Sequence, residues 1–287
     1  MSSLTLYDSS RLYEQIDRLG ILYPTMRTQI IGASVLGKPL VELQLGSGKK
    51  GIHWNGAFHA NEWITTPLLM NVLEVYGTEI CMILNENDAF LSIVPMVNPD
   101  GVDLVHYGSS AAAEYRSLVE SINKKEQHKT YTSWKANIRG IDLNNQFPAG
   151  WELEKQRKPK QPSFRDFPGY SPLSEPESIA MYELTNCYCW HRMLCFHSQG
   201  EVIYWGYNHQ EPDRSHAVAG ELGACSAYIP VHGVDSHAGY KDWFIHHFQQ
   251  EGYTIEVGKG INPLPTSSFS TYFYQVKEIC LKSVQLN

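Results

Sequence analysis

The chain has little of what marks several large classes of protein. Its 287 residues include only 6 cysteines. There are 23 basic and 30 acidic residues, which gives a formal net charge of −7 at pH 7. So few cysteines cannot form a dense disulfide scaffold, which favours a reducing compartment. No basic run is suited to phosphates, so nucleic acid is not expected as a partner. A small uncharged or cationic-tipped substrate fits this composition better.

Long hydrophobic runs are also expected to be absent. We expect no segment of the roughly 18–20 apolar residues that span a bilayer, and residues 1–20 are mixed polar rather than a secretory signal. The sequence therefore predicts a cytoplasmic protein with no membrane partner. Cys187, Cys189 and Cys195, with His191 among them, lack the paired spacing of a structural zinc site, so ordinary buried thiols are expected there.

Apolar residues alternate between strand and helix spacing along the chain, and no internal repeat is found. The 43% hydrophobic content can bury a substantial core. The spacing predicts strands at 51–56, 90–97, 193–196 and 253–257, a hairpin at 28–45, and helices at 9–23, 66–76, 175–188 and 270–284. The proline-rich run 155–172 is expected to be a surface loop. This order predicts one α/β domain, residues 1–287, with a mixed, mostly parallel sheet and helices on both faces.

Polar motifs follow the predicted strands. The five motifs are His-Ala-Asn-Glu-Trp at 59–63, Val-Asn-Pro-Asp-Gly at 97–101, Arg-Gly-Ile-Asp-Leu-Asn-Asn-Gln-Phe at 139–147, Phe-His-Ser-Gln-Gly at 196–200 and Thr-Ile-Glu-Val-Gly at 254–258. In open α/β sheets, ligands bind beyond the carboxyl ends of the strands. His59, Asn98, His197 and Glu256 each stand at such an end, so we expect them around one site. A lone histidine would more often be an ordinary polar residue, but the joint order favours a metal site.

The order of these motifs resembles the zinc metallocarboxypeptidase family. The resemblance implies one zinc per chain, bound by His59, Glu62 and His197, with a fourth position open to water. It also implies that the Asp142 carboxylate accepts a hydrogen bond from the ring nitrogen of His59 that does not bind zinc, as carboxylates often do at zinc sites. A carboxylate that only caps the loop is the alternative for Asp142.

The same resemblance supplies a catalytic mechanism. Glu256 matches the general base, which takes a proton from zinc-bound water as the water attacks the scissile carbonyl and passes it to the leaving nitrogen. Arg139 is the nearest match to the arginine that faces the developing oxyanion. The protein is therefore expected to be a zinc-dependent hydrolase.

Two departures from the family point to one of its branches. Asn145 stands where carboxypeptidases carry the arginine that clamps a terminal α-carboxylate, and the family's mobile tyrosine is missing near Val234. An amide cannot replace a bidentate arginine–carboxylate pair without loss of charge and geometry. In the segments at 142–151 and 256–265, the chain resembles the bacterial γ-D-glutamyl-(L)-meso-diamino-acid endopeptidases.

This second resemblance implies the substrate. The bond cleaved would join γ-D-glutamate to meso-diaminopimelate or L-lysine in murein stem peptides, and several polar contacts would replace the arginine clamp. The candidates for these contacts are Asn144, Asn145, Gln199, His237 and Lys241. Lys241 is a candidate partner for a diaminopimelate carboxylate, or else a solvated lysine. We expect no wall-binding module ahead of the domain, which would suit soluble muropeptides as substrates.

Two other functions stay open from the sequence. The first is a conventional metallocarboxypeptidase, or a related zinc amidase that acts on another small acyl amino acid. The second is a non-catalytic binding domain on the same fold.

Overall fold

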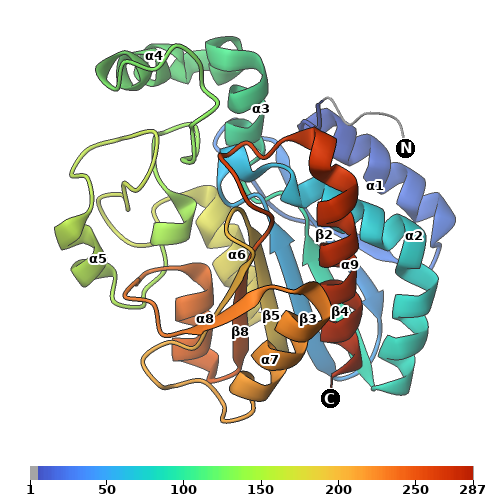
Figure 1. The fold of residues 1–287 in the computed structure, drawn as a ribbon. Coiled ribbons are helices and arrows are strands. Elements are labelled where there is room, and N and C mark those ends of the chain that lie inside the picture. Colours follow the sequence, from blue (N-terminus) through green and yellow to red (C-terminus); the bar gives the residue numbers. More distant parts are fainter. Residues whose placement is uncertain (1–5, 287) are drawn as a thin grey trace.

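Four parallel strands form the centre of the sheet in the computed structural model of this protein, which describes residues 6–286 (Figure 1). The sheet has eight strands in the order β1-β2-β4-β3-β5-β8-β6-β7. The strands are β1 (Arg27–Ala33), β2 (Pro39–Gly46), β3 (Lys50–Gly56), β4 (Ala89–Val94), β5 (Trp190–His197), β6 (Val202–Trp205), β7 (Ile229–His232) and β8 (Glu251–Glu256). The β1–β2, β2–β4 and β6–β8 pairs are antiparallel, so the sheet is mixed, as predicted.

Helices cover both faces of this sheet. They are α1 (Ser9–Leu22), α2 (Thr65–Glu86), α3 (Pro99–Tyr107), α4 (Arg116–Lys125), α5 (Trp151–Arg157), α6 (Pro176–Asn186), α7 (Ser215–Ser226), α8 (Tyr240–Phe248) and α9 (Phe269–Gln285). α2 and α7 both pack against α9, whereas α8 packs against β5 and β8 (Figure 1). Two separate hydrophobic clusters result, one with Val72 and Val276, the other with Met181 and Phe244. The predicted fold class is confirmed.

The central strands are apolar because both of their faces are covered. All six residues of β4 are buried, and seven of the eight residues of β5 are. Strands buried on two faces are nearly continuous hydrophobic runs rather than alternating ones. The polar residues at their carboxyl ends therefore stand out in the sequence and meet at one edge of the sheet.

The helix α2 corrects the expectation about long hydrophobic runs. The helical stretch Ala60–Glu86, which is α2 together with the short 3-10 helix before it, is long and apolar enough to cross a membrane by length and composition. Half of its most apolar window is buried, and α2 packs against α9 and the sheet. A core helix passes the same test, which is how we interpret it.

The prediction of buried thiols is wrong for two cysteines. Cys195 is buried within β5, but Cys187 and Cys189 are exposed. They lie in the turn between the end of α6 at Asn186 and the start of β5 at Trp190, outside the packed faces of both elements. All six cysteines are free.

The run 155–172 is more than a surface loop. It begins inside α5, and Phe167 is buried. The backbone N–H of Asp166 donates to the Asp142 carboxylate at 3.1 Å. This segment therefore reaches the candidate site and helps to hold it.

Candidate active site

The predicted site residues converge at the carboxyl edge of the central strands. His59 lies three residues beyond the end of β3 at Gly56, directly before a short 3-10 helix, Ala60–Glu62. His197 ends β5 and Glu256 ends β8, and the two residues are partners in the register of this strand pair. The structure thus brings His59, His197 and Glu256 to one edge of the sheet.

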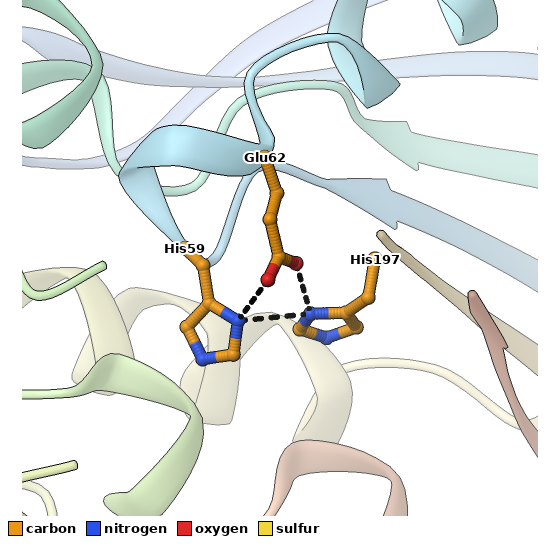
Figure 2. Close-up of side chains that lie close together, drawn as sticks. All are labelled: His59, Glu62 and His197. Carbon is orange, nitrogen blue, oxygen red and sulfur yellow. Dashed lines mark hydrogen bonds and ion pairs between the residues drawn. The ribbon is translucent and has the colours of Figure 1, made fainter. Parts of the chain in front are cut away.

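Two imidazole nitrogens and one carboxylate point at a common centre (Figure 2). His59 Nδ1 lies 3.0 Å from Glu62 Oε1, and His197 Nδ1 lies 2.9 Å from Glu62 Oε2. The two Nδ1 atoms are 3.3 Å apart. If both rings donated to Glu62, their N–H groups would face each other, whereas a cation held by both lone pairs removes that conflict. Two histidines and a glutamate are a known ligand set of catalytic zinc, so the residues fit this metal.

Asp142 holds the far side of the His59 ring. Its Oδ1 lies 3.1 Å from His59 Nε2 and accepts from the backbone N–H of Asn144 at 3.1 Å. Burial alone would raise the pKa of Asp142, but the charge and hydrogen bond of His59 outweigh it and hold this pKa below its usual range. The contact orients the ring with Nδ1 toward the common centre, which suits a supporting carboxylate, and this role of Asp142 stays a prediction.

Lys135 is a charged residue of the site that sequence reasoning missed. Its Nζ lies 2.8 Å from Glu62 Oε1. Burial would raise the pKa of Glu62, but the charges of Lys135 and His59 outweigh it and lower that pKa well below its usual range. Two hydrogen bonds hold the backbone at residues 135 and 136 in place. The N–H of Ala60 donates to the Lys135 carbonyl at 3.0 Å, and Asn98 Nδ2 donates to the Ala136 carbonyl at 3.0 Å. Lys135 lies only four residues before Arg139, inside the Trp-Lys-Ala-Asn run.

Arg139 has other partners. Its Nε donates to the Tyr115 hydroxyl at 3.2 Å, its guanidinium lies 5.7 Å from the centre of that ring, and one terminal nitrogen lies 3.6 Å from Glu175. By contrast, Glu62, Asp142 and Glu256 all raise the pKa of Lys135 against the effect of its burial. An oxyanion role for Arg139 stays a prediction, and Lys135 is a second candidate for that role.

Glu256 is a half-buried residue beside the cluster. Burial and the negative charge of Glu62 raise its pKa to about 8. The backbone around it is fixed, since the N–H of Glu201 donates to the Glu256 carbonyl at 2.8 Å. A positioned carboxyl with a pKa near the working pH suits general acid–base catalysis. Its role as the general base stays a prediction.

Three of the predicted substrate contacts lie on segments that border the cluster. Asn144 Oδ1 accepts from the backbone N–H of Tyr240 at 3.0 Å. Asn145 as a whole residue is 8% exposed, and its backbone N–H donates to the Asp142 carbonyl at 3.0 Å. Gln199 Oε1 accepts from the Gly260 N–H at 3.4 Å.

The other two predicted contacts, Lys241 and His237, contact the segment that follows β6, and Lys241 also pairs with its neighbour in α8. Lys241 Nζ pairs with Asp242 Oδ1 at 2.6 Å and donates to the Gly206 carbonyl at 2.9 Å. His237 Nδ1 lies 2.9 Å from the Tyr207 hydroxyl. Binding roles for all five residues remain predictions.

Comparisons with known proteins agree with this geometry. The model of a family described as zinc carboxypeptidase matches residues 12–278. Gamma-D-glutamyl-L-diamino acid endopeptidase 1 of Lysinibacillus sphaericus is 42% identical over 292 residues, which cover 98% of this chain and 72% of that protein. The uncharacterised protein YqgT of Bacillus subtilis (strain 168) is 48% identical over 278 residues, 92% of this chain and 73% of that protein.

A solved structure shares the fold at low sequence identity. Carboxypeptidase A from Helicoverpa armigera has a TM-score of 0.77 at 17% identity, and the match covers 99% of this chain and 75% of that chain. The family match, the two close relatives and the convergent ligands lead to one conclusion. This chain belongs to the zinc carboxypeptidase family and is a zinc metallopeptidase, with His59, Glu62 and His197 as its candidate zinc ligands.

Proposed function

We propose that the protein hydrolyses the bond between γ-D-glutamate and a diamino acid, meso-diaminopimelate or L-lysine, in murein stem peptides. One observation carries this proposal: the chain is 42% identical, over 98% of its length, to a protein named as a γ-D-glutamyl-L-diamino acid endopeptidase. The family resemblance supports it, because it implies that Asn145 stands where carboxypeptidases carry the carboxylate-clamping arginine. An amide can hydrogen-bond to a substrate but cannot neutralise a terminal α-carboxylate in the fork geometry of arginine.

The chain's own groups can carry the reaction as follows. His59, Glu62 and His197 would hold a zinc ion, which when bound polarises the scissile carbonyl and activates water. Glu256 takes the proton of the attacking water and returns it to the nitrogen that leaves, so that a carboxylate and an amine are released. The ammonium group of Lys135 would face the carbonyl oxygen as it gains negative charge.

Recognition of the diamino acid would rest on weaker polar groups. Three of these groups border the ligand cluster: Asn144, Asn145 and Gln199. The other two, Lys241 and His237, contact the segment that follows β6. Lys241 is already paired with Asp242, so it would offer a substrate carboxylate only part of its charge. Several such contacts suit a small branched peptide better than one deep clamp.

Product identification tests this proposal. The protein is incubated with L-Ala-γ-D-Glu-meso-diaminopimelate and with its L-lysine analogue, and the products are identified by mass. The proposal predicts L-Ala-D-Glu plus the free diamino acid from at least one of the two peptides. The Glu256→Gln variant is the matched control for contaminating peptidases. If both peptides stay intact while N-acyl amino acids are hydrolysed, the function is that of a conventional carboxypeptidase or zinc amidase.

A further inference from the structure

A second group of two histidines and one glutamate lies outside the active site. His209, Glu211 and His232 each place one possible metal-ligating atom within 4.8 Å of the others. His232 Nε2 lies 2.7 Å from Glu211 Oε1, and the rings of His209 and His232 have centroids 5.3 Å apart. The Glu211 side chain is 8% exposed, while that of His232 is 34% exposed. The cluster is therefore open to solvent on its histidine side.

The fold brings these residues together from two segments. β6 and β7 are parallel neighbours in which Trp205 pairs with His232, and the segment after β6 carries His209 and Glu211. Asn208 and His209 have φ angles of 49° and 56°, in the left-handed region, so the chain turns sharply at the histidine.

Gly206 allows the close approach of the two segments. Its φ is +78°, and a Cβ there would lie 2.7 Å from His232 Nε2 and 2.9 Å from Glu211 Oε1. The Cβ of any other residue at position 206 would collide with His232 Nε2 and Glu211 Oε1, two of the three possible ligating atoms. The backbone thus packs directly against the cluster and fixes where these atoms lie.

We propose that His209, Glu211 and His232 form a second metal site, for a borderline divalent transition ion such as zinc. Imidazole together with one carboxylate suits zinc, nickel and copper better than magnesium or calcium. With zinc–nitrogen distances of about 2.0–2.1 Å, ligands in a tetrahedral site lie roughly 3.3–3.5 Å apart, so a small movement of the exposed His209 closes the site. Water completes the coordination. We expect weaker binding here than in the buried active site.

This site is joined to two predicted substrate-binding residues. The N–H of Tyr207 donates to Glu211 Oε2 at 2.9 Å, and the Tyr207 hydroxyl contacts His237 Nδ1 at 2.9 Å. The Gly206 carbonyl accepts from Lys241 Nζ at 2.9 Å. A bound ion would fix the segment after β6 against β7 and so hold His237 and Lys241 in place. The second ion is a structural clamp in this account, whatever peptide the enzyme cleaves.

Metal counting tests the second site apart from the catalytic one. The wild-type protein is stripped of metal with a chelator, dialysed, and titrated with Zn²⁺, and bound metal is measured by elemental analysis. We expect two ions per chain for the wild type and one for His209→Ala. In a His197→Ala background, which disables the active site, one ion should remain. Adding His209→Ala to this background should weaken the binding of the remaining ion by at least about tenfold, or ~1.4 kcal/mol.

His216 offers the matched control. Its ring stacks on Trp205, 5.2 Å between centroids, but it does not belong to the cluster. His216→Ala should bind two ions, and Zn²⁺ in excess of one equivalent should raise the melting temperature of wild type and His216→Ala but not of His209→Ala. A wild type that saturates at one ion, or equal losses in His209→Ala and His216→Ala, would overturn the proposal. Neither result would bear on which peptide is cleaved.

Discussion

Asp142 offers the sharpest test of how the zinc ligands are held. Its Oδ1 faces His59 Nε2 at 3.1 Å, and its Oδ2 accepts the Asp166 N–H at 3.1 Å. Asp142→Ala removes both contacts, so the His59 ring is free to turn and becomes a weaker ligand. Loss of such a supporting carboxylate typically costs 10–100-fold in metal affinity or activity, about 1.4–2.7 kcal/mol.

The assay is zinc affinity by chelator competition, measured alongside turnover. Asp142→Asn keeps the shape, but three donors point at the carboxylate, and the amide nitrogen of Asn cannot accept from them. This variant should therefore also lose zinc affinity. Asp166→Ala is the control, because its backbone N–H remains and its side chain pairs with Lys158 and Arg165 at the surface. A loss as large as that of His59→Ala would make Asp142 a ligand itself. Unchanged affinity in both Asp142 variants would refute the supporting role.

Three further predictions follow from the geometry. Glu256→Gln should keep zinc but lose about 10²–10⁴-fold in turnover, measured with metal content on the same sample; unchanged turnover removes it from the mechanism. Lys135→Met should lower kcat by about 10²–10³-fold and Arg139→Met much less, and the reverse order would return the oxyanion role to Arg139. Burial, with nearby Asp100, raises the pKa of Glu177 to about 8. Between pH ~4.5 and 8 the folded protein keeps a proton on Glu177 that the unfolded chain has released. The stability that this raised pKa contributes is complete below pH ~4.5, and it is lost at about 1.4 kcal/mol of unfolding free energy per pH unit as the pH rises to 8. Glu177→Gln should therefore gain stability over wild type as pH rises through this window in denaturant melts, and a constant difference would contradict the shift.

The sequence was enough to predict the central sheet because its strands are covered on both faces. The runs at 51–56, 90–97, 193–196 and 253–257 correspond to β3, β4, β5 and β8, within a few residues at each end. The polar residues at their ends were visible against this apolar background. The candidate zinc ligands and the place of Asp142 could therefore be found from the order of the motifs together with their resemblance to the zinc metallocarboxypeptidase family.

Other elements carried weaker signals. β6 and β7 are only four residues long and partly exposed, so they show no clear period. α7 is rich in alanine, glycine and serine, and it lacks a distinct apolar face. Without these elements, the cluster of His209, Glu211 and His232 could not be foreseen, because its members come from two segments that only the sheet register brings together.

Lys135 was missed for a different reason. The sequence offered a lysine and an arginine four residues apart, and the arginine matched the expected chemistry. The carbonyls of residues 135 and 136 accept from Ala60 and Asn98, which turns Lys135 toward Glu62. A contact between distant segments decides which cation enters the site, and local sequence does not encode it.

The central claim concerns Asn145, and a ratio of specificity constants tests it most directly. We would measure kcat/KM for L-Ala-γ-D-Glu-meso-diaminopimelate and for hippuryl-Phe and hippuryl-Arg, in the wild type and in Asn145→Arg. The account predicts that the wild type cleaves the murein peptide and barely touches the hippuryl peptides. Asn145→Arg should lower the murein activity, because a buried guanidinium loses its hydration without meeting a carboxylate at the required place. Wild-type hydrolysis of hippuryl peptides at about 10⁴ M⁻¹s⁻¹ or more, the ordinary range for enzymes, would contradict the account and identify a conventional carboxypeptidase.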